Sequence, residues 1–271
     1  MHAGNARNQS GLSDLPDGIH HVRLTDGRQV FAKVRRRAPQ GFFAAEARGL
    51  AALRGTAAMR VPKVFAVDDH HIALEDLGSG RATPADWERA GRALANLHAV
   101  RGARFGFDAP GWCGDSVQDN TGDADGFRFF AERRLLPQTR SAVGAGRLDR
   151  DDARRIEVLS ARLREWLPQR PPVLVHGDLW LGNLHVCADG ELALIDGGAV
   201  HYGWAEGDLA MLTLFGEPPA AFFSAYETQA GVRSDWRERA PLLNLYHLLN
   251  HLNLFGGGYL GAIRGVLGRF A

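Results

Sequence analysis

The chain has 271 residues and a formal net charge of +1; 45% of its residues are hydrophobic and 23% are charged. These values are typical of a globular protein with one large or two small domains, and they exclude the strong charge excess of proteins that bind nucleic acid or anionic membranes. The N-terminus has no apolar signal core, no run is long enough to span a membrane, and two cysteines make no disulfide framework, so we expect a cytoplasmic protein.

The N-terminal part predicts a small antiparallel sheet. Four segments have strand character, namely residues 19–24, 29–34, 64–67 and 71–74. If Asp26 and Gly27 form a two-residue turn between the first two segments, Lys33 lies opposite His20. The preceding residues, 13–18, are expected to form a nucleotide-binding loop, although they contain no Gly-rich pattern.

A predicted helix follows this hairpin and gives Lys33 a partner. Its apolar face is formed by Phe43, Leu50 and Leu53. Glu46 falls in the same apolar sector, where a carboxylate is costly unless a cation pairs with it. Lys33 is the natural candidate, and the pair would hold the lysine towards the phosphates of ATP. Taken alone, Lys33 is better explained as a solvated strand lysine. The alternative for Glu46, which we favour less than the ion pair, is a residue at the edge of a loosely packed helix.

The next segment has the character of a hinge between two lobes. Glu75, Asp76 and Leu77 continue the last strand and run into glycines at positions 78 and 80. We expect their backbone groups to bind the adenine of ATP. The expected boundaries are therefore an N-terminal nucleotide-binding lobe at residues 1–77, a hinge at about 75–80 and a C-terminal lobe at residues 81–271.

Helices are predicted through much of the C-terminal lobe. They lie after the capping-box pattern at Thr83 and at residues 127–136, 149–167, 218–230 and 241–255. The buried face of the second of these ranges is marked by Ile156, Leu159, Leu163 and Trp166. Residues 101–126, rich in Gly and Asp, are expected to form a loop that helps to cover an acceptor substrate. His98 is expected to be a hydrogen-bonded core histidine.

The residues with the clearest chemistry lie between positions 173 and 196. An apolar strand ends in His176, and Asp178 is followed by Asn183 and, after an Asp-Gly turn, by Asp196. If Asp189 and Gly190 form a two-residue turn, Asn183 lies directly opposite Asp196. Oxygen ligands from an amide and a carboxylate suit Mg²⁺, and Asp178 is then free to take a proton from an attacking hydroxyl. Any one of these acids would also fit an ordinary surface hairpin, but the joint order is that of the catalytic and metal loops of protein kinases.

Two further sites leave alternatives open. Asp208, near a predicted helix start, either caps that helix or accepts backbone N–H groups of the catalytic loop, and we favour the second role. His247 and His251 lie four residues apart on one helix. They would suit zinc, but no glutamate or third ligand accompanies them, so we expect no zinc site there.

Several motifs make the sequence similar to the fructosamine kinase (ketosamine 3-kinase) family, within the kinase-like aminoglycoside and choline phosphotransferases. The motifs are HGDLWLGN at 176–183, LIDGGAVHYGWAEGDLAMLTLFG at 194–216, YHLLNHLNLFGGGY at 246–259, FFAAEARGLAAL at 42–53 and VPKV at 61–64. The resemblance as a whole extends over roughly residues 33–259. The chain departs from the family pattern at Gly197 and Gly198, where relatives have Pro-Ala, which removes a stiff element and keeps the aspartate before it.

The resemblance implies an α+β, two-lobed protein-kinase-like fold with a small antiparallel sheet lobe and a larger, mostly helical lobe. It implies ATP- and Mg²⁺-dependent phosphorylation of the 3-hydroxyl of a ketosamine sugar. The implied roles are catalytic base (Asp178), Mg²⁺ ligands (Asn183, Asp196), ATP binding (Lys33, Glu46, Glu75, Asp76, Leu77), acceptor binding (Trp180, Tyr202, His247, Asn250) and support of the site (His176, Asp208).

The partner expected on this basis is a small glycated amine or sugar. The near-neutral charge predicts no binding to nucleic acid or membranes, and the oligomeric state is left open, with a monomer favoured. Two alternatives stay open within and beyond the enzyme class. The first is a kinase for an aminoglycoside, choline or a related small molecule, and the second is a catalytically silent nucleotide-binding module.

Overall fold

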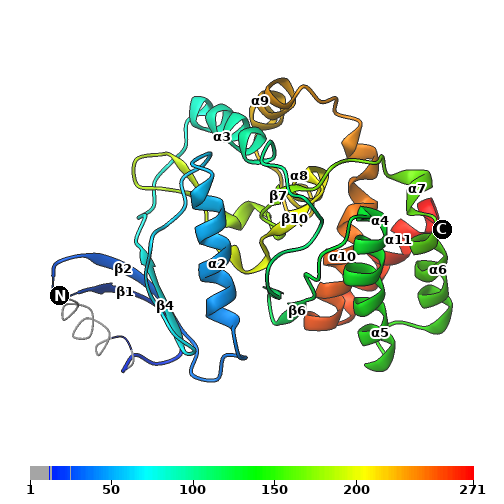
Figure 1. The fold of residues 1–271 in the computed structure, drawn as a ribbon, viewed down its shortest axis with the longest axis horizontal. Coiled ribbons are helices and arrows are strands. Elements are labelled where there is room, and N and C mark those ends of the chain that lie inside the picture. Colours follow the sequence, from blue (N-terminus) through cyan, green and yellow to red (C-terminus); the bar gives the residue numbers. More distant parts are fainter. Residues whose placement is uncertain (1–11, 13, 25) are drawn as a thin grey trace.

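A computed structural model describes residues 12, 14–24 and 26–271 of the chain. A small sheet lies at one end of the molecule and a mostly helical body at the other, with helix α2 (Phe42–Gly55) between them (Figure 1). The predicted two-lobed α+β architecture is therefore confirmed. Of the predicted nucleotide loop, residue 13 lies outside the described residues, as do residues 1–11 of the predicted N-terminal lobe.

The small sheet is antiparallel, with the strand order β1-β2-β4-β3 among the described residues. Its strands are β1 (Gly18–Arg23), β2 (Gln29–Val34), β3 (Val64–Val67) and β4 (His71–Glu75). Strand β2 alternates in burial, as a two-residue period requires. Val30 and Ala32 pack with Leu12 and Ala73 in a small apolar cluster, whereas Lys33 contacts helix α2.

Both Asp-Gly hairpins have a register one residue away from the predicted one. Lys33 pairs with Ile19, and strands β8 (Leu184–Val186) and β9 (Leu192–Leu194) pair Leu184 with Leu194. The expected partners, His20 for Lys33 and Asn183 for Asp196, are therefore wrong.

The physical reason is the loop length. Leu24 N–H donates to Arg28 C=O at 2.9 Å, and Cys187 N–H donates to Glu191 C=O at 2.8 Å, so three residues lie inside each loop. The glycine is the last of the three and has a positive φ, +86° at Gly27 and +88° at Gly190. Three-residue loops with a left-handed final residue are a common hairpin class, and the added residue moves every cross-strand pair by one.

Helix α2 (Phe42–Gly55) joins the small sheet to the rest of the molecule. Its predicted apolar face is confirmed, because Phe43, Leu50 and Leu53 are buried in the same cluster as residues of the helical lobe. Ile72 and Leu74 of β4 belong to this cluster as well. The main core therefore continues across the boundary between the lobes, whose predicted residue limits stay a prediction.

The helical lobe contains the predicted helices together with several short elements. Its helices are α3 (Pro84–Leu97), α4 (Gly126–Phe130), the π-helix η1 (Ala131–Leu135), α5 (Leu136–Gly144), α6 (Arg150–Ala161), α7 (Leu163–Trp166), α8 (Ala205–Met211), α9 (Ala220–Ala230), α10 (Trp236–Phe255) and α11 (Leu260–Phe270). The expected capping box at the start of α3 is present, with Asp86 N–H donating to the Thr83 hydroxyl. The short strands are β5 (Gly111–Cys113), β6 (Ser116–Gln118), β7 (Val173–Val175) and β10 (His201–Gly203).

Two local expectations are wrong, and the segment after Asp196 contains strand β10, which pairs with β7. The segment 101–126 is not a plain loop, because it contains the β5–β6 hairpin. Trp166 is exposed rather than part of the buried face, and its ring edge contacts Phe270 of α11. Three-residue strands are too short for an alternation pattern to reveal them.

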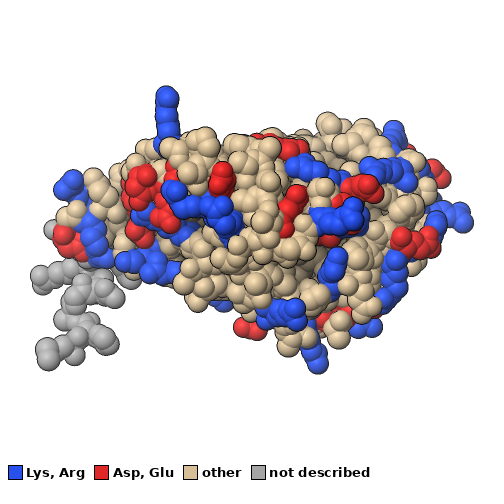
Figure 2. All heavy atoms as spheres, turned by 90° about the horizontal axis from the view of Figure 1, so that it is seen from above, with Lys and Arg blue, Asp and Glu red and all other residues tan. Residues whose placement is uncertain are grey.

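The surface carries both signs of charge. Basic and acidic side chains are interspersed over the face shown in Figure 2. Among the described residues, no helix combines the length and the apolar character needed to cross a bilayer.

Candidate active site

The predicted catalytic loop, residues 176–183, follows strand β7. Gly177 has a φ of +81°, and a Cβ at this position would overlap the carbonyl oxygen of Ala199. Only glycine allows both this backbone conformation and this close approach. The turn brings Asp178 to the boundary with the small lobe.

Asp208 of helix α8 holds this loop in place. Its carboxylate accepts hydrogen bonds from His176 N–H at 2.7 Å and from Gly177 N–H at 2.9 Å. Helix α8 begins at Ala205, so Asp208 does not cap it, and the bracing contacts are the ones that are present. Burial raises the pKa of Asp208, but the hydrogen bond with His98 and the other donors outweigh burial and hold the pKa below its usual range.

A buried chain of hydrogen bonds continues behind Asp208. His98 Nε2 lies 3.2 Å from Asp208 Oδ2, and His98 Nδ1 lies 2.8 Å from the Tyr226 hydroxyl. His98 is therefore the hydrogen-bonded core histidine that was expected, and it also contacts the brace of the catalytic loop.

His176 joins the catalytic loop to the metal loop. Its Nε2 hydrogen-bonds the carbonyl oxygen of Ile195 at 2.7 Å, next to Asp196. This is a supporting contact of the kind expected of His176, because the positions of Asp178 and Asp196 then depend on each other.

Asn183 and Asp196 both lie just outside the β8–β9 ladder. Asn183 ends a short 3₁₀ helix, η2 (Leu181–Asn183), and Asp196 has a left-handed backbone with a φ of +64° before η3 (Gly197–Ala199). The direction of the two side chains is therefore set by these irregular segments and not by the strand register. The amide nitrogen of Asn183 donates to Asp178 C=O at 2.8 Å, so its amide oxygen is presented on the other side.

Lys33, Glu46 and Asp196 meet at the boundary of the lobes. Lys33 Nζ lies 2.6 Å from Glu46 Oε1 and 3.5 Å from Asp196 Oδ1. Glu46 is buried and Asp196 is half exposed. Burial lowers the pKa of Lys33, but the two carboxylates outweigh burial and raise it, so the lysine stays cationic at neutral pH. The ion pair expected between Lys33 and Glu46 is present.

Helix α2 contacts the metal loop through two glycines. A Cβ at Gly49 would overlap the carbonyl oxygen of Gly197, and a Cβ at Gly197 would lie 2.6 Å from Leu50 N. Side chains at these positions would push the helix away from the loop. The departure from the family pattern at Gly197 thus coincides with a close backbone contact that places Glu46 near Asp196.

Asp178 lies in a mostly buried environment. Burial raises the pKa of its carboxyl to about 6, with a contribution from the negative charges of Asp196 and Asp208 and an opposing one from His176. A carboxylate with this pKa is ionised at neutral pH and is a stronger base than an exposed aspartate. It can therefore accept a proton from a hydroxyl group placed beside it.

A pocket of about 330 Å³ opens next to Asp178. Its aromatic lining consists of Trp180, Phe215, His251, Phe255 and Tyr259. Of the predicted acceptor-binding residues, Trp180 and Asn250 line this pocket. The amide group of Asn250 is already engaged, since its nitrogen donates to Cys113 C=O and its oxygen accepts from Gln138.

The structure does not bring the other two predicted acceptor residues into this lining. Tyr202 lies on β10, with its ring against Gly102 and Phe107. His247 lies behind the pocket and faces Asp178, with 3.7 Å between Nδ1 and Oδ1. His251 Nδ1 hydrogen-bonds His247 C=O, so the two histidines do not point at a common ion.

The missed pocket residues come from separate segments of the chain. Phe255 and Tyr259 flank the Gly256–Gly258 run, and this pairing of aromatic residues with glycines was the available signal for them. Cys113 and Phe215 carry no local pattern that points to a site.

The predicted hinge residues are held by contacts with both lobes. Leu77 C=O accepts from Ala188 N–H at 2.9 Å, and Glu75 N–H donates to Lys63 C=O at 2.8 Å. Asp76 accepts from Gly78 N–H and pairs with His21 at 2.7 Å. These two backbone groups are therefore in use, and an adenine would need other backbone groups of the segment.

Comparison with known proteins gives consistent relatives over most of the chain. The sequence model of the fructosamine kinase family matches residues 12–270. The chain is 38% identical over 244 residues to the "Probable ketoamine kinase" of Synechocystis sp., which covers 87% of this chain and 81% of that protein. It is 31% identical over 257 residues to the chloroplastic protein-ribulosamine 3-kinase of Arabidopsis thaliana, covering 90% and 76%.

Solved structures agree. A "putative fructosamine-3-kinase" from Thermobifida fusca superposes with a TM-score of 0.86 at 36% identity, covering 92% of this chain and 88% of that one. An ADP-bound aminoglycoside phosphotransferase superposes with a TM-score of 0.60 at 14% identity, covering 94% and 90%. The second likeness is one of fold alone.

Proposed function

This chain belongs to the fructosamine kinase family, and from that premise we propose that it transfers the γ-phosphoryl group of ATP to a sugar hydroxyl of a ketosamine. The observation that carries the proposal is the meeting of Lys33, Glu46 and Asp196 within one ion-paired group. Three elements far apart in the sequence supply them: strand β2, helix α2 and the metal loop. This is the arrangement that phosphoryl transfer needs, because most of the catalysis is positioning and charge stabilisation.

Asn183 and Asp196 are the residues that would hold Mg²⁺. An amide oxygen and a half-exposed carboxylate form a hard-oxygen donor set, which fits Mg²⁺ and leaves room for phosphate oxygens and water. When bound, the ion would neutralise charge on the phosphates of ATP.

Asp178 acts as the catalytic base. Its carboxylate borders the aromatic pocket, where the acceptor would lie, and it is ionised at neutral pH. It takes the proton of the attacking hydroxyl as the bond to phosphorus forms. Lys33 holds the phosphates of ATP, and Glu46 fixes the position of its ammonium group.

The pocket beside Asp178 suits a glycated amine. Exposed ring faces of Trp180, Phe215 and Phe255 offer apolar surfaces for the C–H faces of a sugar. The names of the relatives, ketoamine kinase and protein-ribulosamine 3-kinase, support this acceptor class. Both cysteines are free and buried, which agrees with the proposed cytoplasmic location.

An acceptor panel tests the proposal. Purified full-length protein is incubated with Mg²⁺-ATP and with ribose- and fructose-derived ketosamines of lysine, an aminoglycoside or choline, and ADP release is measured. Ketosamine-dependent ADP release and a phosphorus NMR signal of a sugar 3-phosphate are expected. A good aminoglycoside substrate beside a ketosamine at background would establish the alternative acceptor class. ADP release that no acceptor increases would indicate a silent nucleotide-binding module.

A further inference from the structure

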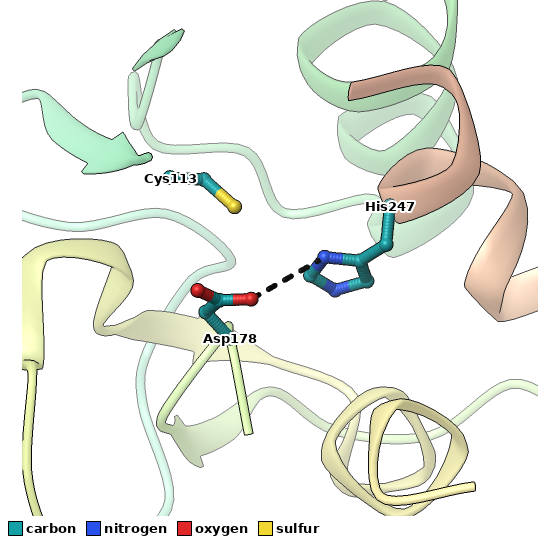
Figure 3. Close-up of side chains that lie close together, drawn as sticks. All are labelled: Cys113, Asp178 and His247. Atoms are coloured by element: carbon teal, nitrogen blue, oxygen red, sulfur yellow. Dashed lines mark ion pairs between the residues drawn. The ribbon is translucent and has the colours of Figure 1, made fainter. Parts of the chain in front are cut away.

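Three metal-ligating side chains gather beside the pocket and come from separate parts of the fold (Figure 3). Cys113 ends strand β5, Asp178 follows β7 and His247 lies within helix α10. One ligand atom from each residue lies within 4.8 Å of the other two, and His247 Nδ1 is 3.7 Å from Asp178 Oδ1. Among the described residues, this is the one group of histidine, cysteine and acidic side chains with such spacing.

The buried side chain of His247 independently indicates a ligand-binding site. Its side chain is 6% exposed, and Nδ1 has no hydrogen-bond partner among the described residues. Buried polar atoms without a partner are rare and call for an explanation.

We propose that Cys113, Asp178 and His247 form a second cation site, specific for a thiophilic divalent ion such as Zn²⁺. A thiolate and a carboxylate would balance the charge of the ion, and the imidazole would complete a three-residue set. Ligands at the usual Zn²⁺ distances around a tetrahedral centre are roughly 3.4–3.7 Å apart, so the His247–Asp178 pair already matches and the widest pair needs to close by about 1 Å. The pocket that Cys113 and Asp178 line gives access to the fourth position.

This site is distinct from the proposed Mg²⁺ ligands. Mg²⁺ prefers oxygen donors, which Asn183 and Asp196 provide, and a thiolate with an imidazole selects a softer ion. On binding, the Cys113 thiol loses its proton to solvent and forms the metal–sulfur bond.

Occupation of this site would block transfer. The Asp178 oxygen that binds the ion can no longer take the proton of the acceptor hydroxyl. This inhibitory consequence rests on the proposed function, whereas ion binding itself does not.

The binding test uses Co²⁺ as a coloured substitute for Zn²⁺, with full-length protein and neither ATP nor acceptor. One equivalent of Co²⁺ should produce a thiolate-to-cobalt charge-transfer band that Zn²⁺ removes. Cys113→Ser should abolish the band and weaken Zn²⁺ binding at least tenfold. Cys187→Ser, which changes the other buried cysteine, should retain both. His247→Gln should also weaken Zn²⁺ binding and provides the test if Cys113→Ser does not fold.

The absence of a charge-transfer band in the wild-type protein, or its persistence in Cys113→Ser, overturns the proposal. In the activity arm, buffered free Zn²⁺ in excess Mg²⁺-ATP should inhibit ketosamine phosphorylation, and the inhibition should weaken in His247→Gln relative to Cys187→Ser. Metal binding without any kinase activity would reject the proposed function and leave the site established. Activity that is insensitive to saturating Zn²⁺ would overturn the inhibitory role.

Discussion

The two sides of the active site are built from different kinds of contact. On the nucleotide side, Lys33 pairs with Glu46 and Asp196, and Asp208 holds the loop of Asp178 through two backbone hydrogen bonds. On the acceptor side, the side chains of Trp180, Phe215 and Phe255 are 40%, 42% and 68% exposed. The comparison predicts that loss of one polar partner will reduce transfer strongly, whereas loss of one exposed ring will have a smaller effect.

Replacement of the proposed base, Asp178, should have the largest effect. Asp178→Asn should lower kcat by about 10²–10⁴-fold, because the amide cannot accept the hydroxyl proton, while ATP binding is retained. Burial of the carboxylate raises its pKa to about 6 and therefore costs stability at neutral pH. The free energy of unfolding of the variant should therefore be about 1–3 kcal/mol higher than that of the wild type. Kinetics and urea unfolding check both effects, and near-normal turnover would remove Asp178 from the role of base.

Replacement of Asp208 should lower the stability of the protein, whereas replacement of Asp178 should raise it. In Asp208→Asn, the amide N–H₂ group would face one of the two backbone N–H groups that the carboxylate now accepts from, and that buried N–H would lose its partner. The substitution should therefore destabilise the protein by about 2–4 kcal/mol and lower kcat. Asp235→Asn, at an exposed acid, should change stability by less than about 0.5 kcal/mol. Equal unfolding free energies for the two variants would contradict the bracing role.

The backbone contact between α2 and the metal loop can be tested with a glycine-to-alanine substitution in α2, whose effect on stability should be opposite to the usual one. Alanine normally stabilises a helix relative to glycine by about 1 kcal/mol. Gly49→Ala should instead destabilise the protein by about 1–3 kcal/mol and lower kcat about tenfold or more, because the new methyl displaces the helix that carries Glu46. Gly55→Ala, in the same helix with open space around it, is the matched control and should be neutral or stabilising.

The pH profile should follow the ionisation of Asp178. The base is active when deprotonated and its pKa is raised to about 6, so kcat/KM should be level at neutral pH and fall about tenfold per pH unit below pH 6. An unshifted carboxyl would move this fall to about pH 4. A profile measured where the protein remains folded by circular dichroism distinguishes the two cases.

The acceptor side should give the smallest effects. Phe255→Ala should raise the acceptor KM only several-fold and leave the KM for ATP and the stability nearly unchanged, because the ring is mostly exposed before substrate binds. The control is Val158→Ala, which should change neither the KM for the acceptor nor the KM for ATP. Val158 is an exposed apolar residue of helix α6 and does not line the pocket. A larger loss of kcat in Phe255→Ala than in Gly49→Ala would contradict the expectation that substitutions on the acceptor side have the smaller effects.

The nucleotide side was predictable from sequence because its residues form local sequence patterns. A glutamate within an apolar helix face requires a cation, and the spacing of Asp178, Asn183 and Asp196 points to a metal-dependent transfer. The strand register was not predictable, since Asp-Gly turns occur in both two- and three-residue loops and the difference is one residue. Cross-strand arithmetic therefore paired Asn183 with the wrong residue.

The acceptor side was less predictable because distant segments form it. Tyr202 and Asn250 were assigned from motif position, yet the ring of one packs elsewhere and the amide of the other is already bonded. Cys113 comes from a hairpin too short to show a strand pattern. Contacts of this kind depend on tertiary packing, which local propensity does not encode.

The backbone contact between Gly49 and Gly197 has a consequence for control of the enzyme. In this conformation helix α2 lies directly against the metal loop, because no side chain separates Gly49 from Gly197. Withdrawal of α2 would break this backbone contact together with the Lys33–Glu46 ion pair, so an inactive state reached in that way would lose contacts to both lobes.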